Sequence, residues 1–330
     1  MEPLYITLIA ACGAIISIIL LLFVIAYLIK RAAFGSRCDK NPLLKYFTAE
    51  DFNLSSEMVD IATFKGDKIR GVIYKKEDVT PRQELIIFCH GMGPGHIAYT
   101  TEIAYLCYSG YTVLAPDYIG CNASEGKKII GFENGRNSVV KAINYAREVM
   151  KHTDKIYLVG HSWGGYSALC AASVSDEVDK VVAISAPDKA EKAIAGAVGS
   201  QVSRVFAKIL YPFLASICMG KSAADAAESC RCKVMLVHGE KDTVVPWTNS
   251  AYYNADGEHI TKYLVNGRKH NPYNTVAAEE KLAELSLSLA KFKKGKVGEE
   301  YFENFDFVAA TEEDSDVMSE IAQFLDNQTA

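Results

Sequence analysis

One serine of the chain stands where a nucleophile is expected. Residues 155–168 have the sequence KIYLVGHSWGGYSA, an apolar run followed by the motif G-x-S-x-G and then by small residues. A strand that turns sharply into a helix lifts the hydroxyl of Ser162 out of a sheet, and the glycines on both sides keep strand and helix from colliding. The alternative is a purely structural turn. Because strand and helix signals surround the motif, we interpret Ser162 as the nucleophile of an acyl-transfer reaction.

A nucleophilic serine needs a histidine base and an acid that orients this base. In one common order, the acid and the histidine follow the serine on loops after later strands. Asp242 lies in VMLVHGEKDTVVP after an apolar run, and His270 lies in KYLVNGRKHNPY after the last such run. These two residues are the predicted acid and base, and Asp188 at the end of VVAISAPD is the competing acid. The base should follow both the serine and the acid in the chain, and it should lie in a loop after a later strand. Six histidines fail at least one of these conditions: His90, His96, His152, His161, His238 and His259.

A second turn rich in glycine, in LIIFCHGMGPGH, directly follows another apolar run. Glycines there let the chain bend and direct backbone N–H groups into a site. The predicted oxyanion donors are therefore the amides of Met92 and of Trp163, the residue after the nucleophile. A phosphate-binding glycine loop is the alternative, and it is disfavoured because neither G-x-G-x-x-G nor a Walker sequence is present.

Alternating strands and helices must position these residues, and this alternation suggests a mostly parallel sheet with helices on both faces. No internal repeat or low-complexity linker interrupts it, so residues 56–330 are expected to form one domain, preceded by a connector over residues 30–55. The expected strands are 58–63 and 69–74 as an opening hairpin, then 84–89, 112–115, 155–159, 180–184, 233–237 and 260–265. The expected helices are 97–109, 134–151, 163–174, 275–291, a block within 188–230 and a final helix at about 315–326.

The N-terminal residues 4–29 form an uncharged apolar run. As a helix it is about 39 Å long, enough to cross a bilayer core with some tilt. A cleaved signal peptide and a buried core helix are the alternatives, but the run is long, lacks a positive region before it and is followed by Lys30 and Arg31. We therefore expect a single-pass membrane anchor within residues 1–29. The positive charges after the run predict that the remainder of the chain is cytoplasmic.

Composition excludes several classes of protein. The 330 residues include 35 Lys and Arg against 40 Asp and Glu, a net charge of −5 without the basic stripe of a nucleic-acid surface. The nine cysteines are an odd number and lack C-x-x-C spacing. A small secreted disulfide scaffold is therefore excluded, and a reducing compartment is the simpler interpretation.

Five sequence segments together resemble the α/β-hydrolase superfamily, in particular its branch of serine aminopeptidases S33 and monoacylglycerol lipases. They are HGMG, DYIGCNASEG, GHSWGG, GEKDTVVP and the final histidine. The chain departs from the branch at Pro94, where Glu is common, and at Asn122, which replaces a glycine. The resemblance covers residues 56–330 and implies Ser162 as nucleophile, His270 as base, Asp242 as orienting acid, and the Met92 and Trp163 amides as oxyanion donors.

Two further segments are longer than such a fold requires. The insertion at about 188–232 carries an apolar set that includes Val202, Ile209 and Phe213. The resemblance implies a small helical cap over an acyl pocket, and an amphipathic packing helix is the alternative. Residues 297–330 are rich in acids, and we interpret them as a solvated acidic surface with a final helix.

The sequence thus predicts a membrane-anchored serine hydrolase that cleaves acyl esters through an acyl-enzyme intermediate. A small-molecule or lipid-like ester is the expected substrate, and neither a metal nor a cofactor is required. A peptidase or amidase of the S33 type, with the same three residues, is the alternative enzyme. A catalytically silent, membrane-tethered binding module is the alternative outside enzymes. The sequence gives no indication of the oligomeric state.

Overall fold

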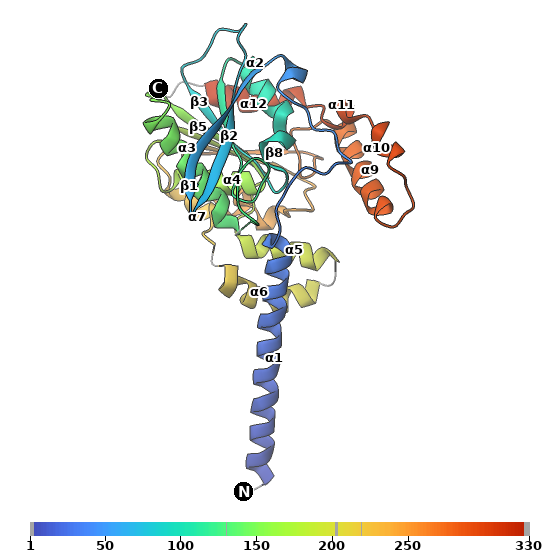
Figure 1. The fold of residues 1–330 in the computed structure, drawn as a ribbon. Helices are drawn as coiled ribbons and strands as arrows, with labels where there is room; N and C mark the ends of the chain where they lie inside the picture. Colours follow the sequence, from blue (N-terminus) through green and yellow to red (C-terminus); the bar gives the residue numbers. More distant parts are fainter. Residues whose placement is uncertain (1–2, 130, 202–203, 219, 327–330) are drawn as a thin grey trace.

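A computed structural model describes residues 3–129, 131–201, 204–218 and 220–326. Its centre is one eight-stranded sheet with the order β1-β2-β4-β3-β5-β6-β7-β8 (Figure 1). The pairs β1–β2 and β2–β4 are antiparallel, and all other neighbours are parallel. The expected strands are all present, over Ser55–Phe64 (β1), Asp67–Lys75 (β2), Leu85–Cys89 (β3), Thr112–Pro116 (β4), Ile156–His161 (β5), Lys180–Ile184 (β6), Lys233–Gly239 (β7) and Ile260–Val265 (β8).

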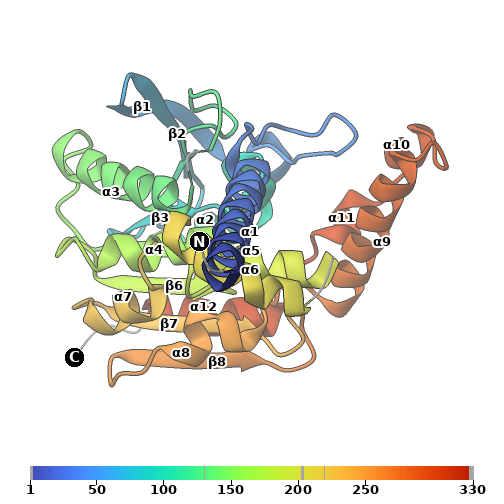
Figure 2. The same cartoon turned by 90° about the horizontal axis from the view of Figure 1, so that it is seen from below.

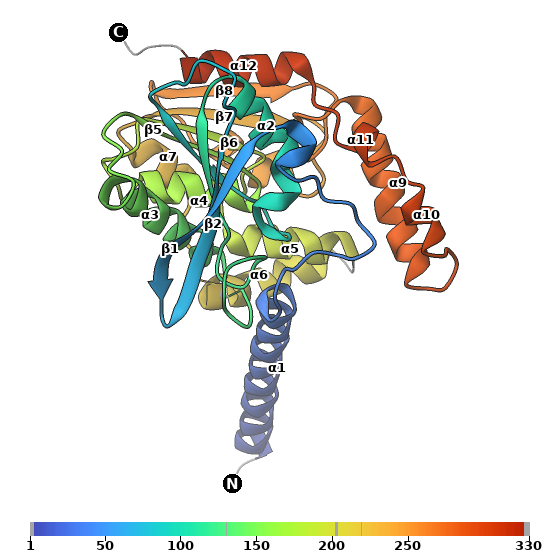
Figure 3. The same cartoon turned by 45° about the horizontal axis from the view of Figure 1, so that its top comes forward.

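Helices cover both faces of this sheet, as the strand and helix alternation predicts (Figure 3). One hydrophobic core contains residues of α3, α4, α7 and α8, and a second core contains residues of α2 and α12. The helices extend over Pro3–Phe34 (α1), Thr100–Tyr108 (α2), Phe132–Glu148 (α3), Trp163–Ala172 (α4), Ala190–Gln201 (α5), Arg204–Cys218 (α6), Ala223–Ser229 (α7), Ala251–Asn254 (α8), Val276–Phe292 (α9), Glu300–Glu303 (α10), Phe307–Ala310 (α11) and Ser315–Asp326 (α12).

Strand β3 illustrates why the central strands are continuous apolar runs. Its side chains alternate between the two cores, with Leu85 and Ile87 in one and Ile86 and Phe88 in the other. All of its residues are buried. A parallel strand covered on both faces has no solvent side that would require polar residues.

Helix α1 extends away from the sheet (Figure 1). Within the described residues it is the one helix that is by itself long and apolar enough to cross a membrane, over Tyr5–Phe34. Residues 5–21 are exposed, whereas Ala26 and Phe34 near its other end are buried in the protein. Phe34 packs edge-on against Phe132 at a centroid distance of 5.8 Å. A backbone bridge between Cys38 and Cys121 then connects the chain after α1 to the loop after β4.

The insertion contains α5, α6 and α7. Helices α5 and α6 pack against each other, α6 also packs against α1, and α7 packs against α4. Val202, one of the apolar residues singled out in the sequence, lies outside the described residues. The final helix is confirmed as α12, which buries Val317, Met318, Ile321 and Leu325 against the sheet.

Candidate active site

The predicted nucleophile lies on a strained turn between β5 and α4. Ser162 has φ 57° and ψ −120°, a conformation that costs about 1–3 kcal/mol in a residue other than glycine. Its N–H donates to the carbonyl of Ile184 at 2.7 Å, which holds the turn against β6. Gly164 is required by space, because a Cβ atom there would lie 1.8 Å from the carbonyl oxygen of Cys89. The G-x-S-x-G motif therefore brings the helix directly against β3.

The structure brings the predicted base and acid to this serine. The Ser162 hydroxyl lies 3.0 Å from Nε2 of His270. Nδ1 of the same ring lies 2.8 Å from Oδ2 of Asp242. Both contacts are satisfied when Nδ1–H donates to the carboxylate and Nε2 accepts from the hydroxyl. Three residues far apart in the sequence thus form one hydrogen-bonded chain, in the order that a serine nucleophile requires.

Asp242 is held in the loop after β7 by two backbone amides. Its Oδ1 accepts from the N–H groups of Val244 at 2.8 Å and Val245 at 2.9 Å. Burial alone would raise the pKa of the Asp242 carboxyl, but the hydrogen bond and charge of His270 and the Val245 amide lower this pKa by more. The group is therefore an ionised acceptor for His270 at neutral pH.

The competing acid, Asp188, is occupied elsewhere. Its carboxylate accepts from the Ser222 hydroxyl at 2.5 Å, from the Ala224 N–H at 3.3 Å and from Nζ of Lys192 at 3.0 Å. Asp188 thus joins the beginning of α5 to the beginning of α7. Of the two acids that the sequence offered, the structure places Asp242 beside His270.

A further histidine, set aside in the sequence because it adjoins the nucleophile, connects two sides of the site. Nε2 of His161 lies 2.9 Å from the carbonyl oxygen of His270, and Nδ1 lies 3.0 Å from the hydroxyl of Tyr99. The Gly91 N–H donates to the same hydroxyl at 3.1 Å. Burial and the nearby His270 lower the pKa of His161 to about 3. The ring is therefore neutral, donates from Nε2 and accepts the Tyr99 proton at Nδ1.

The loop after β3 carries the predicted oxyanion donor Met92. Its neighbour Gly91 abuts the elbow so closely that a Cβ atom would lie 2.4 Å from the Tyr99 hydroxyl and 3.4 Å from Cβ of Ser162. Trp163 begins α4, and its buried indole donates to the carbonyl of Phe132 at 3.0 Å. The two predicted donor residues thus come from segments that meet at Ser162.

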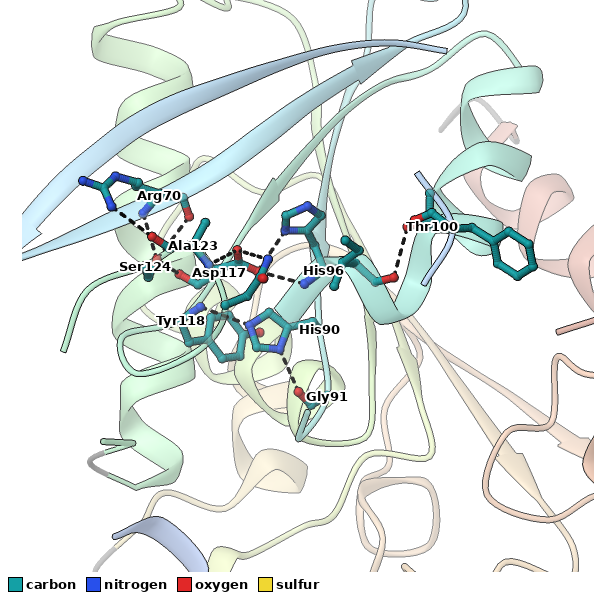
Figure 4. A network of polar contacts seen from close by, with 12 residues as sticks. Arg70, His90, Gly91, His96, Thr100, Asp117, Tyr118, Ala123 and Ser124 are labelled. Atoms are coloured by element: carbon teal, nitrogen blue, oxygen red, sulfur yellow. Dashed lines mark hydrogen bonds and ion pairs between the residues drawn. The ribbon is translucent and has the colours of Figure 1, made fainter. Parts of the chain in front are cut away.

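The motif DYIGCNASEG forms the support of this loop (Figure 4). Asp117 is fully buried and accepts from the backbone and from Nδ1 of His96, both at 2.8 Å, and from Nδ2 of Asn122 at 2.9 Å. Asn122 has a φ of 39°, a backbone region that asparagine tolerates better than most residues, which explains how it can stand in place of glycine. Gly95 approaches the same carboxylate, since a Cβ atom would lie 1.9 Å from Oδ1.

His90, at the start of the loop, is a second neutral histidine. The Tyr118 N–H donates to its Nε2 at 3.0 Å, and its Nδ1 lies 2.7 Å from the carbonyl oxygen of Gly91. Burial lowers the pKa of His90 to about 4. The loops after β3 and β4 are consequently connected by hydrogen bonds that use every polar atom of this ring (Figure 4).

A cavity of about 390 Å³ opens beside the serine. Met92, Ser162 and His270 line one side of it. Leu282 of α9 and Ala310 of α11 line another side, so the C-terminal segment is more than the solvated acidic surface that its composition indicated. None of the described residues of the 188–232 insertion lines this cavity. The expected cap over an acyl pocket stays a prediction.

Two carboxyl groups that the sequence did not single out, Glu102 and Glu313, interact with each other, and the first of them lines the cavity. Glu102 of α2 lines it, is buried and accepts from the Thr101 hydroxyl at 2.9 Å. Burial raises the pKa of Glu102 to about 7, and burial together with the Glu102 charge raises that of Glu313 to about 9. Oε1 of Glu313 is inaccessible and has no hydrogen-bond partner among the described residues. Only tertiary packing brings these two glutamates together, so no local pattern could have revealed them.

Comparisons with known proteins agree on the fold. A family profile described as alpha/beta hydrolase fold matches residues 84–216. The AB hydrolase superfamily protein YfhM of Bacillus subtilis is 31% identical over 107 residues, which are 31% of this chain and 36% of that protein. The match thus spans about a third of the length of this curated relative.

Solved structures extend the likeness over most of the chain. The esterase Pf2001 of Pyrococcus furiosus has a TM-score of 0.57 at 18% identity and covers 80% of this chain and 99% of its own. The α/β-hydrolase GrgF of Penicillium sp. sh18 has a TM-score of 0.51 at 18% identity, over 72% of this chain and 98% of its own. With its mixed, mostly parallel sheet and the helices on both faces, the chain has the α/β-hydrolase fold.

Proposed function

We propose that this chain is a membrane-anchored serine hydrolase that cleaves carboxylic esters. The observation that carries the proposal is the hydrogen-bonded chain from Ser162 through His270 to Asp242, at 3.0 and 2.8 Å. Hydrolases of this fold place a nucleophile, a base and an acid in the same order. The Pyrococcus furiosus neighbour is an esterase by its name, which favours esters over amides as the first substrates to test.

The proposed reaction has two halves. His270 accepts the Ser162 proton at Nε2 while Oγ attacks the ester carbonyl, and the protonated ring then gives this proton to the departing alkoxide. The acyl group stays on Oγ. In the second half His270 takes a proton from water while the water oxygen attacks the acyl carbonyl. The protonated ring then returns this proton to the departing Oγ of Ser162, and the carboxylic acid and the free serine are released. The amides of Met92 and Trp163 are the proposed donors to the oxyanion of both tetrahedral intermediates.

The resemblance to one family branch and the size of the cavity support the proposed substrate class. The sequence segments that resemble the S33 and monoacylglycerol lipase branch favour a small or lipid-like acyl ester. A cavity of about 390 Å³ lies at the lower end of the range for small-molecule sites, which fits an acyl group of modest size. No metal or cofactor takes part in the proposed steps.

The proposed organisation places the catalytic part beside a membrane. Residues 1–29 hold the anchor, 30–55 the connector and 56–330 the hydrolase domain with the insertion at 188–232. The exposed, apolar α1 supports the anchor, and Lys30 and Arg31 support a cytoplasmic catalytic domain. Protease added outside intact cells should leave that domain intact, and its degradation would reverse the orientation.

Substitution of the nucleophile tests the activity. Full-length protein in detergent and its Ser162→Ala variant should be compared on short-chain aryl esters, monoacylglycerols and aminoacyl amides. We expect ester turnover by the wild type and its loss in the variant. Ser173→Ala, at the end of the same helix, is the matched control and should keep full turnover. Cleavage of amides alone would favour the peptidase alternative, and folded wild-type protein inert toward all three classes would favour the binding module.

A further inference from the structure

Helix α6 of the insertion lies directly against the N-terminal helix. Phe213 packs edge-on against Phe23 of α1, with ring centroids 4.8 Å apart. Farther along both helices, Nζ of Lys30 donates to the carbonyl of Ile217. Seen along α1, the helices α5 and α6 lie beside its inner end (Figure 2). Helix α6 of the insertion thus packs against the end of α1 that enters the protein.

The length of α1 whose residues are exposed sets the depth of α6. Residues 5–21 are all exposed, and partial burial begins at Leu22. These 17 exposed residues are about 26 Å of helix, whereas a bilayer core is about 30 Å thick. If α1 crosses the core from Tyr5 onward, its contact with Phe213 falls at the boundary between acyl chains and headgroups.

The outer face of α6 has the composition expected of a helix at the boundary between acyl chains and headgroups. Leu210 and Leu214 are fully buried and fix the inner face. On the outer face, Val205 is 68% and Ile209 49% exposed, and the exposed Lys208 lies between them. Apolar side chains with a lysine that can extend toward headgroups are typical of a helix lying in a membrane interface.

The same side of the molecule carries the candidate active site. The strands β3 and β7 are parallel to β5, so the loops that follow them lie at the edge of the sheet where Ser162 lies. Those loops present Met92, Val244 and Trp247, which are 44%, 57% and 45% exposed. Met92 and Val244 line the cavity at Ser162. Helix α5 follows β6 at this edge, so the anchor, α6 and the cavity share one side.

We propose that α6 lies in the interface of the lipid bilayer that α1 crosses, and that it holds the carboxyl edge of the sheet against this bilayer. The occupant of the exposed α6 face is lipid. Its continuity with the exposed surface of α1 and the matching depth argue for lipid over a second copy of the chain. The cavity then receives an ester that resides in the adjacent leaflet, a substrate class that rests on the proposed ester hydrolysis.

Lipid contact can be measured on the full chain without any catalysis. Ile209→Trp and Val205→Trp each add an indole on the outer face of α6. Val149→Trp adds one at the end of α3, where the side chain is 61% exposed and precedes β5, at the opposite edge of the sheet. Each variant is reconstituted in phosphatidylcholine vesicles with or without brominated acyl chains, and the wild-type emission is subtracted because of Trp163 and Trp247.

Brominated lipid should quench about half or more of the added emission at positions 205 and 209, because an interfacial helix lies about 5–10 Å into the boundary. Position 149 should be quenched little. Equal quenching at 149 and at both α6 positions would overturn the proposal. The proposal would also be overturned if both α6 positions were protected from quenching and this protection disappeared when the protein was diluted among lipids. That result would assign this face to a second copy of the chain.

The substrate clause has a separate kinetic test. Val205→Asp with Ile209→Asp should lower turnover of a medium-chain monoacylglycerol in vesicles about 5- to 10-fold, since charge disfavours interfacial insertion. Turnover of a water-soluble acetyl ester should be unchanged. An equal loss on both substrates, or no loss on either, would overturn the proposal that the ester enters the cavity from the adjacent leaflet. A wild type inert toward both esters would overturn the proposed ester hydrolysis, while the quenching result would still decide the position of α6.

Discussion

The two sides of the cavity are built differently. On the elbow side, Ser162, His161 and His270 are held by hydrogen bonds within a few residues of strand ends, and their positions follow from the parallel sheet. On the side of α2 and α11, Glu102 and Ala310 meet through packing of segments about 200 residues apart. In the proposed reaction the first arrangement serves the bond-breaking step, and the second shapes the space beside it. Substitutions on the two sides should therefore fail in different ways.

The largest effect is expected from the acid. Asp242→Asn keeps the size of the side chain but removes the charge and favours the wrong His270 tautomer, so kcat should fall about 10⁴-fold. Asp188→Asn is the matched control, because Asp188 contacts Ser222 and Lys192 rather than His270. It should change kcat only slightly in folded protein. Steady-state kinetics with an aryl ester measure both, and the reverse ranking would transfer the role to Asp188.

A smaller effect is expected from the Tyr99 hydroxyl. Tyr99→Phe leaves the Gly91 N–H and Nδ1 of His161 without their partner, a loss of about 1–3 kcal/mol. Because these groups connect the loop of Met92 to His270, kcat should fall about 5- to 150-fold with little change in KM. Tyr105→Phe, on the helix α2 that begins directly after Tyr99, is the control. A rise in KM at constant kcat would instead show that Tyr99 acts in binding.

Substitutions on the other side of the cavity, at α2 and α11, should change substrate selectivity and leave the rate of bond cleavage unaffected. Thr311, beside Ala310, lines the cavity, and Thr311→Trp narrows it. We expect kcat/KM for a bulky acyl ester to fall about 10-fold or more, while that for an acetyl ester is retained, because steric changes in a pocket act on the fitted group. Thr311→Ser is the conservative control. Equal losses for both esters would mean that this wall supports the catalytic residues after all.

The smallest effect concerns stability and pH. Burial raises the pKa of Glu102 to about 7, so the folded protein favours the protonated form. This contribution is fully present below the ordinary pKa of 4.5 and is lost as pH rises through about 7. Glu102→Gln should therefore raise Tm by about 2–4 °C at pH 8 and leave it unchanged at pH 4. Thermal unfolding at the two pH values measures this, with Glu320→Gln on α12 as a control. An equal rise in Tm at pH 4 and pH 8 would contradict a buried, protonated Glu102.

The difference between the two sides of the cavity also explains which features could be predicted from the sequence. The G-x-S-x-G motif requires a particular backbone at Ser162 and no side chain at Gly164, so local sequence specifies the elbow. Chain order and strand ends then single out Asp242 and His270, because parallel strands bring successive loops to one edge. The role of α9 and α11 as a wall, and the pairing of Glu102 with Glu313, depend on how distant segments dock. The contact of α6 with α1 depends on docking in the same way.

The most direct test of the central claim is the covalent adduct itself. Folded full-length protein is treated with a fluorophosphonate, its intact mass is measured, and the modified peptide is sequenced. We expect one adduct per chain, on Ser162, with loss of ester turnover in proportion to labelling and protection by an ester substrate. An adduct on another residue, or ester turnover that survives complete labelling of Ser162, would contradict the assignment of Ser162 as the nucleophile.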